Sequence, residues 1–121
     1  MHQAVLAEGV FVAGCPSRIL LEHVTSKWGF LLLIALSEGD HRWSELRRRA
    51  DGISEKMLAQ TLKTLERDGL VSRHAQATIP PRVDYSLTDR GRELSELLVP
   101  LAAWTLENAE AVINVQDALE H

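Results

Sequence analysis

The side chains whose types and spacing could do chemistry lie together in the segment 54–68. Lys56, Gln60 and Lys63 recur at intervals of three and four residues, so a helix would place them on one face, beside the small Ala59. Lysine ammonium groups can bind guanine acceptors or phosphates, a glutamine amide can pair with adenine, and a small residue permits close approach to bases. This face therefore suits a DNA groove, although an ordinary solvated helix can carry the same residue types.

The residues around this face predict a helix-turn-helix. Two amphipathic segments, 42–50 and 54–68, are joined by a short turn in which Gly52 can adopt the positive φ that closes the first helix. Ser54 can cap the free N–H groups at the start of the second helix. The leucines of the second segment recur at helical spacing and form its buried side. The polar face therefore belongs to the second helix of the motif.

A β-hairpin is predicted after the second helix. Residues 82–87 alternate between apolar and polar types, which indicates a half-buried strand, and residues 70–74 are its expected partner. Pro80 and Pro81 stiffen the tip, where Arg82 is either placed to contact a phosphate or the minor groove or simply solvated. A helix-turn-helix followed by a hairpin is a winged helix-turn-helix, in which one helix enters the major groove of DNA. The predicted fold class is mainly α (α+β) with a two-stranded β-wing.

Nine side chains from these elements are the candidates for DNA contact. They are Arg42, Arg48, Ser54, Lys56, Met57, Gln60, Lys63, Arg73 and Arg82. A winged helix can also serve protein contacts alone, because a fold does not determine a function. The alternative hypothesis is therefore a ligand-responsive or protein-interaction module without tight DNA binding.

The charge of the chain is divided in a way that favours this DNA hypothesis. The net charge is −4, but residues 42–92 hold eleven Lys and Arg against seven acids, a local balance of +4. A locally basic face can displace counterions from phosphates even when the rest of the protein is acidic. The 121 residues suit one domain with a modest core, and no apolar run approaches the roughly 20 residues of a membrane span. We therefore expect no membrane partner.

The segments that flank the motif predict a homodimer. Pro16 begins a short helix, and residues 28–36 are apolar almost all round, as in a central buried helix. Thr88-Asp89 opens a long segment that Pro100 is expected to kink or restart, and whose apolar residues exceed what so small a domain can cover. A second copy would cover them and would present two recognition helices about one duplex turn apart.

These expectations give a single domain over residues 1–121. Its DNA-binding core spans about 26–88, and its dimerisation segments span about 1–25 and 89–121. Within the first of these segments, the side chains that we expect to face inward from the short helix are Ile19, Leu20, His23 and Val24.

The single cysteine, Cys15, lies directly before the first helix. The helix dipole and the nearby Arg18 are expected to stabilise its thiolate and so make it reactive. A reactive thiol there could form an adduct, a sulfenic acid or a disulfide across the dimer, whereas the alternative is a small buried hydrophobe. One cysteine and the absence of a recognisable signal peptide predict a cytoplasmic location.

Many motifs in order make the chain resemble the HxlR-type (MarR-like) winged-helix regulators of bacteria and archaea. The resemblance covers Cys15 to Trp104 and rests on Cys15-Pro16, Lys27-Trp28, Gly39, Arg42-Trp43-Ser44-Glu45-Leu46, Gly52-Ile53-Ser54, Lys56-Met57-Leu58, Leu62, Leu65-Glu66, Asp68-Gly69-Leu70-Val71, Arg73, Pro81, Val83, Tyr85-Ser86-Leu87-Thr88, Gly91 and Trp104. It implies a homodimeric transcription factor that binds operator DNA and has no enzymatic activity. Some members that this chain resembles use the position of Cys15 to sense oxidants, quinones or aldehydes. The chain departs from the family pattern at Thr25-Ser26, Trp43 and Asp84, without threat to the fold.

An enzyme is not expected from the residues themselves. The five histidines lie in no recognisable metal-ligand spacing, and no glycine-rich phosphate loop is present, so we expect no cofactor and no metal. The partners expected are double-stranded operator DNA and a second copy of the chain. The sequence leaves open the operator, the regulated genes, activation or repression, and a small-molecule effector.

Overall fold

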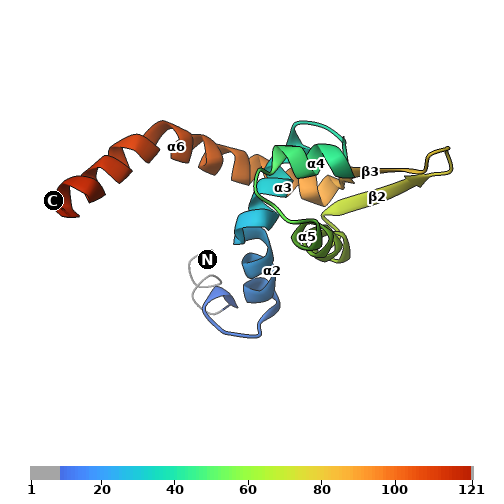
Figure 1. Ribbon diagram of the computed structural model, residues 1–121. Coiled ribbons are helices and arrows are strands. Elements are labelled where there is room, and N and C mark those ends of the chain that lie inside the picture. The colour runs from blue at the N-terminus through green and yellow to red at the C-terminus, as the bar shows by residue number, and fades with distance from the viewer. Residues whose placement is uncertain (1–8, 121) are drawn as a thin grey trace.

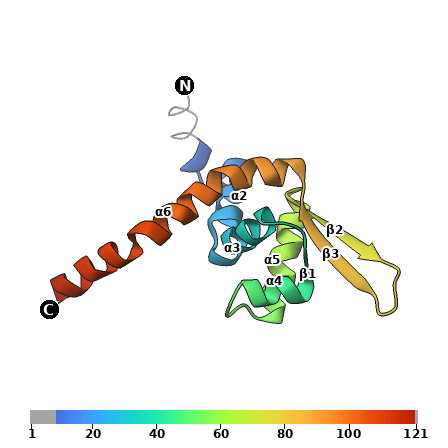
Figure 2. The ribbon, with the colours of Figure 1, turned by 90° about the horizontal axis from the view of Figure 1, so that it is seen from above.

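The computed structural model describes residues 9–120, and the side chains of residues 9–114. Its elements in chain order are α2 (Pro16–Thr25), α3 (Lys27–Ser37), β1 (His41–Arg42), α4 (Trp43–Arg49), α5 (Glu55–Arg67), β2 (Val71–Gln76), β3 (Arg82–Leu87) and α6 (Asp89–Glu120). The helices α2 to α5 gather at one end of α6. The β2–β3 hairpin projects from this group of helices in the direction away from the long arm of α6 (Figures 1 and 2).

The core forms around α3, whose apolar sequence leaves no polar face to solvate. Leu32 and Leu33 have no exposed surface, and they pack with the equally buried Leu46 of α4 and Leu58 and Leu65 of α5. Burying one leucine side chain contributes about 1.5–3 kcal/mol relative to its exposure. This cluster therefore fixes the helix-turn-helix on α3, as the periodicity of the sequence predicts.

The turn between α4 and α5 has the predicted chemistry. Gly52 has a φ of +90°, a backbone conformation that residues with a Cβ atom rarely adopt. Ser54 is the N-cap of α5, and its hydroxyl oxygen accepts a hydrogen bond of 3.0 Å from the backbone N–H of Met57. Between them, Ile53 is only 5% exposed and so anchors the turn in the core. The prediction of a helix-turn-helix is confirmed.

The wing is a three-stranded sheet rather than the two-stranded hairpin that the sequence predicts. β2 and β3 pair antiparallel, with Val71 opposite Leu87, and the short β1 pairs with the other edge of β3. Two residues are too few to show an alternating pattern, so β1 leaves no signal of its own. As a result α4 begins at Trp43, and Arg42 is its N-cap rather than its first helical residue.

Of the two alternatives expected at Pro100, a kink or a restart, the structure excludes the restart, because α6 is one continuous helix through this residue. A proline removes one backbone hydrogen bond and crowds the preceding turn. Here α6 packs on α3, and Leu98, directly before the proline region, is 8% exposed. The second half of α6 extends away from the helical core (Figures 1 and 2).

The short helix α2 begins at Pro16 as predicted, but its apolar residues divide between two environments. Val24 is 6% exposed, whereas Ile19 and Leu20 are 42% and 43% exposed in the single chain. The expectation that all of them face inward is therefore wrong for this chain by itself, because α2 is covered only at its C-terminal end. None of the described helices has the length and apolar composition to cross a membrane by itself, and α2 with α3 reaches that composition only across a 72° bend.

Candidate nucleic-acid interface

The outer face of α5 presents the side chains that the sequence selects. Lys56, Gln60 and Lys63 are all exposed, and Met57 beside them is 38% exposed. Among the side chains that the structure describes, neither lysine has a carboxylate within 4.0 Å. The side chain of Ser54 is used differently from the others, because its oxygen caps the helix. The face thus offers two ammonium groups and one amide that other groups can bind.

The arginines around α5 contrast with these lysines because most of them are paired. Arg47 binds Glu55 at 2.9 Å, and Arg49 binds Glu38 through two hydrogen bonds of 2.9 and 2.7 Å. Hydrogen bonding by Arg49 lowers the pKa of the Glu38 carboxyl below its usual value. Arg48, the candidate between these two arginines, is exposed and has no such acidic partner among the described side chains. Of the α4 arginines at 47, 48 and 49, Arg48 is therefore the one without an acidic partner among the described side chains.

Arg42 is placed by the start of α4. Its backbone N–H donates a 2.9 Å hydrogen bond to Glu45, and its Nε lies 3.6 Å from the same carboxylate. The backbone hydrogen bond lowers the pKa of the Glu45 carboxyl. In the sheet, Arg42 lies opposite Asp84 of β3. The charge of Arg42 is therefore paired with Glu45.

In the wing, Arg82 is held by Asp84, which is not among the nine candidates chosen from the sequence. The Nε of Arg82 donates to Asp84 at 3.0 Å, and the side-chain amide of Gln76 donates to the other carboxylate oxygen. Asp84 is 16% exposed at the side chain, while Arg82 is 48% exposed. Asp84 thus fixes Arg82 along the strand. The pairing of β2 with β3 brings Gln76 opposite Arg82, which only the register reveals.

Hollows between the elements bring candidates from different parts of the chain together. Lys63 of α5 and Arg73 of β2 line a hollow of about 350 Å³, whose wall includes Trp43. Arg42 and Arg82 line another, of about 500 Å³, between the start of α4 and the wing tip. Trp43 lines both hollows, and also a third one, which Arg48 lines. The structure thus groups Lys63 with Arg73 and Arg42 with Arg82, while Lys56, Met57 and Gln60 lie on α5 and Ser54 caps it.

The sulfur of Cys15 lies at the start of α2, away from this surface. Cys15 is the N-cap residue of α2 and is partly exposed, and its Sγ lies 3.6 Å from the hydroxyl of Ser17. The guanidinium of Arg18 instead contacts Glu22 at 3.5 Å and donates to the carbonyl oxygens of Val10 and Phe11. Among the described residues, the guanidinium of Arg18 therefore makes no contact with the Cys15 thiol that it was expected to stabilise as a thiolate.

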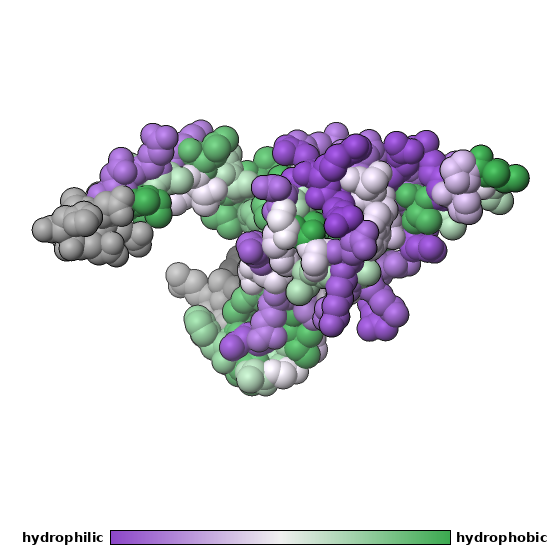
Figure 3. All heavy atoms as spheres, viewed as in Figure 1, coloured by the Kyte–Doolittle hydropathy of each residue, from purple (hydrophilic) through white to green (hydrophobic). Residues whose placement is uncertain are grey.

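Polar and apolar surfaces occupy different parts of the molecule. Hydrophilic residues gather over α4, α5 and the sheet, and apolar residues appear along α2 and α6 (Figure 3). On α6, Leu97, Leu101 and Trp104 are 72%, 52% and 56% exposed. The prediction that this helix is too apolar for its own domain to cover is confirmed.

Comparisons with known proteins agree with this architecture. The model of the HxlR-like helix-turn-helix family matches residues 23–112. The HTH-type transcriptional regulator YtfH of Escherichia coli strain K12 is 52% identical over 113 residues, which cover 93% of this chain and 90% of that protein. Both the family and this relative are regulators of transcription rather than enzymes.

Solved structures show the same fold. The transcriptional regulator YtfH from Salmonella typhimurium superimposes with a TM-score of 0.85 at 47% identity, over 90% of this chain and 97% of that one. The redox regulator HypR in its oxidised form gives a TM-score of 0.72 at 35% identity, over 78% of this chain and 97% of that one. The predicted winged-helix architecture is therefore shared with known regulators.

Proposed function

This chain belongs to the HxlR-like helix-turn-helix family of transcriptional regulators, and we propose that it binds operator DNA as a homodimer. The observation that carries the proposal is the outer face of α5, where Lys56, Gln60 and Lys63 are exposed and the two lysines have no acidic partner among the described side chains. Solvated surface lysines are common, but here Lys63 lines one hollow with Arg73, and Arg48 lines another that shares Trp43 with it. A surface that gathers cations without neutralising them attracts phosphates.

In this proposal α5 enters the major groove and the wing lies beside it. Lys56 and Gln60 reach base edges near the start of α5, and the thioether of Met57 contacts an apolar group such as a thymine methyl. Lys63, Arg73 and Arg48 bind phosphates and so fix the position of the protein on the duplex. Arg42 and Arg82 bind the backbone or minor groove while acidic neighbours hold their orientation.

A second copy of the chain is the partner that fits α2 and α6. The exposed Leu97, Leu101 and Trp104 of α6 and Ile19 and Leu20 of α2 supply the apolar surface that a dimer would bury. The dimerisation segments remain those proposed from the sequence, about 1–25 and 89–121, of which residues 1–8 and 121 lie outside the described residues. A two-fold dimer would bind a pseudo-palindromic operator. We propose a cytoplasmic location for this activity.

Cys15 is the residue through which we propose a redox or electrophile response. Its partial exposure and its place at the N-cap of α2 support this role, and so does the similarity to a redox regulator. Oxidation or alkylation there would move α2, and with it the spacing of the two recognition helices. A small-molecule signal that acts elsewhere is the competing possibility. Replacing Cys15 with Ser and finding an unchanged response to oxidant would remove the proposal for this residue.

The test is fluorescence anisotropy with DNA from upstream of the gene and its neighbours, at two salt concentrations, with and without oxidant. We expect selective binding that weakens steeply with salt, because each neutralised phosphate releases counterions. Light scattering on the same sample is expected to give the mass of a dimer. The absence of selective binding at low salt to any of these fragments and to a genomic fragment library would favour the protein-interaction alternative.

A further inference from the structure

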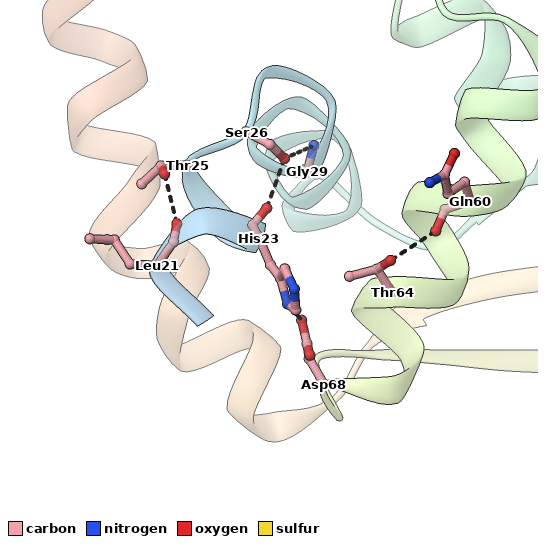
Figure 4. Close-up of polar contacts among 8 residues, drawn as sticks. All are labelled: Leu21, His23, Thr25, Ser26, Gly29, Gln60, Thr64 and Asp68. Atoms are coloured by element: carbon pink, nitrogen blue, oxygen red, sulfur yellow. Dashed lines mark hydrogen bonds and ion pairs between the residues drawn. The ribbon is translucent and has the colours of Figure 1, made fainter. Parts of the chain in front are cut away.

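We propose that His23 of α2 is a positioning residue for the recognition helix α5, to whose C-terminal end it is joined through Asp68. The Nδ1 atom of His23 lies 2.8 Å from Oδ2 of Asp68 (Figure 4). The two side chains are 33% and 17% exposed, so neighbouring atoms shield the contact from solvent. The two residues are 45 positions apart in the chain. Among the described residues, no other hydrogen bond joins α2 to α5 or its cap.

The backbone of His23 is held firmly on α3. The hydroxyl of Ser26 donates to the His23 carbonyl oxygen at 2.8 Å and accepts from the N–H of Gly29 at 3.2 Å (Figure 4). A Cβ at Gly29 would lie 2.3 Å from that same carbonyl oxygen, so only glycine permits this approach. The end of α2 is therefore held against the first turn of α3. This contact fixes the backbone position from which the imidazole of His23 extends.

Asp68 is free to bind His23 because the end of α5 is complete without its carboxylate. The backbone N–H of Asp68 donates to Thr64 at 3.0 Å, and Gly69, with a φ of +75°, donates to Glu66 at 3.0 Å. The N–H of Leu70 then closes the helix by donating to Leu65 at 3.0 Å. These bonds satisfy the carbonyls of the last turn, as in a Schellman ending. The side chain of Asp68 takes no part in these backbone hydrogen bonds, and its carboxylate instead lies against the imidazole of His23.

The His23–Asp68 contact connects the two surfaces to which the proposed function assigns dimerisation, on α2, and DNA binding, on α5. This step of the inference rests on that proposed function. α2, whose N-cap is Cys15, presents Ile19 and Leu20 to solvent, whereas α5 presents Lys56 and Lys63. A displacement of α2, by a second copy or by modification of Cys15, reaches the end of α5 through the His23–Asp68 hydrogen bond. The bond thereby sets the orientation in which α5 meets DNA.

Two substitutions at His23 separate the hydrogen bond from the bulk of the side chain. His23→Asn keeps an N–H donor at the δ position, the position from which His23 contacts Asp68, whereas His23→Leu removes it. On the other side, Asp68→Asn keeps an acceptor and Asp68→Ala removes it. Thr25→Val is the matched control in α2, because it removes a hydrogen bond of 2.6 Å to Leu21 that stays within the helix.

The first measurement is amide hydrogen exchange on the full-length protein without DNA. We expect His23→Leu and Asp68→Ala to speed exchange at least about threefold in the last turn of α5, at residues 65–70, and to leave α3 unchanged. His23→Asn and Thr25→Val are expected to exchange there as the parent protein does. Unchanged exchange at residues 65–70 in both His23→Leu and Asp68→Ala would overturn the proposal.

The second measurement is a double-mutant cycle on DNA affinity. We expect His23→Leu and Asp68→Ala each to weaken selective binding about threefold to tenfold, and the double variant to be no weaker than either single variant. Independent, multiplying losses would contradict a role through this pair. If the parent protein shows no selective binding, the proposed function fails, while the exchange experiment still decides whether His23 positions α5.

Discussion

Lys63 of α5 and Arg73 of β2 line the same hollow, although one belongs to the recognition helix and the other to the wing. Both side chains are exposed, and neither has a carboxylate partner among the described residues. These two cations line the hollow together with Trp43 and the acidic Glu66, and they form a surface on which a phosphate can be bound from two sides.

Replacing Lys63 or Arg73 with glutamine is expected to weaken binding to all DNA sequences by a similar factor. Each substitution removes one phosphate contact, so the slope of log affinity against log salt should fall by about 1. Anisotropy titrations over a range of salt measure both quantities. Arg47→Gln is the matched control, because Arg47 is already paired with Glu55, and it should leave the slope unchanged. An unaltered slope in both test variants would show that this pair does not contact phosphate.

Ser54→Ala is expected to lower the free energy of unfolding by about 1 kcal/mol. The substitution leaves the N–H of Met57 without its acceptor and so weakens the start of α5. Chemical denaturation measures the loss, and Ser37→Ala is a suitable comparison, because its hydroxyl donates within the last turn of α3. Ser54→Asp should restore most of the stability, since aspartate also caps helices well. Equal stability of Ser54→Ala and the parent would exclude a capping role.

The ion pair between Arg49 and Glu38 predicts a pH dependence. Because Arg49 lowers the pKa of Glu38 in the folded state, the pair stabilises the fold above the pKa of glutamate in the unfolded chain. This contribution is lost as the pH falls through the lower, folded pKa. Arg49→Gln should therefore reduce the Tm at pH 7 by about 1–3 °C, since both groups are largely solvated, and the difference should vanish at a pH well below the lowered pKa of Glu38. A difference that is equal at both pH values would contradict the assignment.

Leu101→Glu on α6 is expected to convert the dimer into monomers. Leu101 is 52% exposed in the single chain, so a charge there costs the monomer little but would be buried in the proposed interface. Sedimentation or light scattering measures the mass, and circular dichroism shows that the fold persists. Glu107→Gln, elsewhere on α6, is the control. A dimer that tolerates glutamate at position 101 would place the interface elsewhere.

The sequence predicts the parts of the fold that depend on local chemistry. The turn at Gly52 and the cap at Ser54 follow from residue type, and the periodic leucines locate α5 within one residue at each end. The strand β1 could not be found, because its two residues are held only by pairing with β3. Similarly, residue type at Pro100 left a kink and a restart open, and only the structure shows that α6 continues without a restart.

The candidate site shows the same division. The exposed face of α5 follows from helical spacing, so Lys56, Gln60 and Lys63 could be chosen from the sequence. The partners of the α4 arginines could not be, since Arg49 meets Glu38 at the end of another helix and Arg47 meets Glu55 across the turn. The inward position of His23 could be predicted, but its partner Asp68 lies 45 residues away and only the packed helices bring them together.

The central claim is that the outer face of α5 selects the DNA sequence. The most direct test compares the affinity of the parent protein and of Gln60→Ala for its selected operator and for that operator with single base changes. We predict that Gln60→Ala weakens operator binding by about 1–3 kcal/mol and loses discrimination at one base pair in each half-site. Full discrimination at every position in Gln60→Ala, and likewise in Lys56→Ala, would contradict the claim.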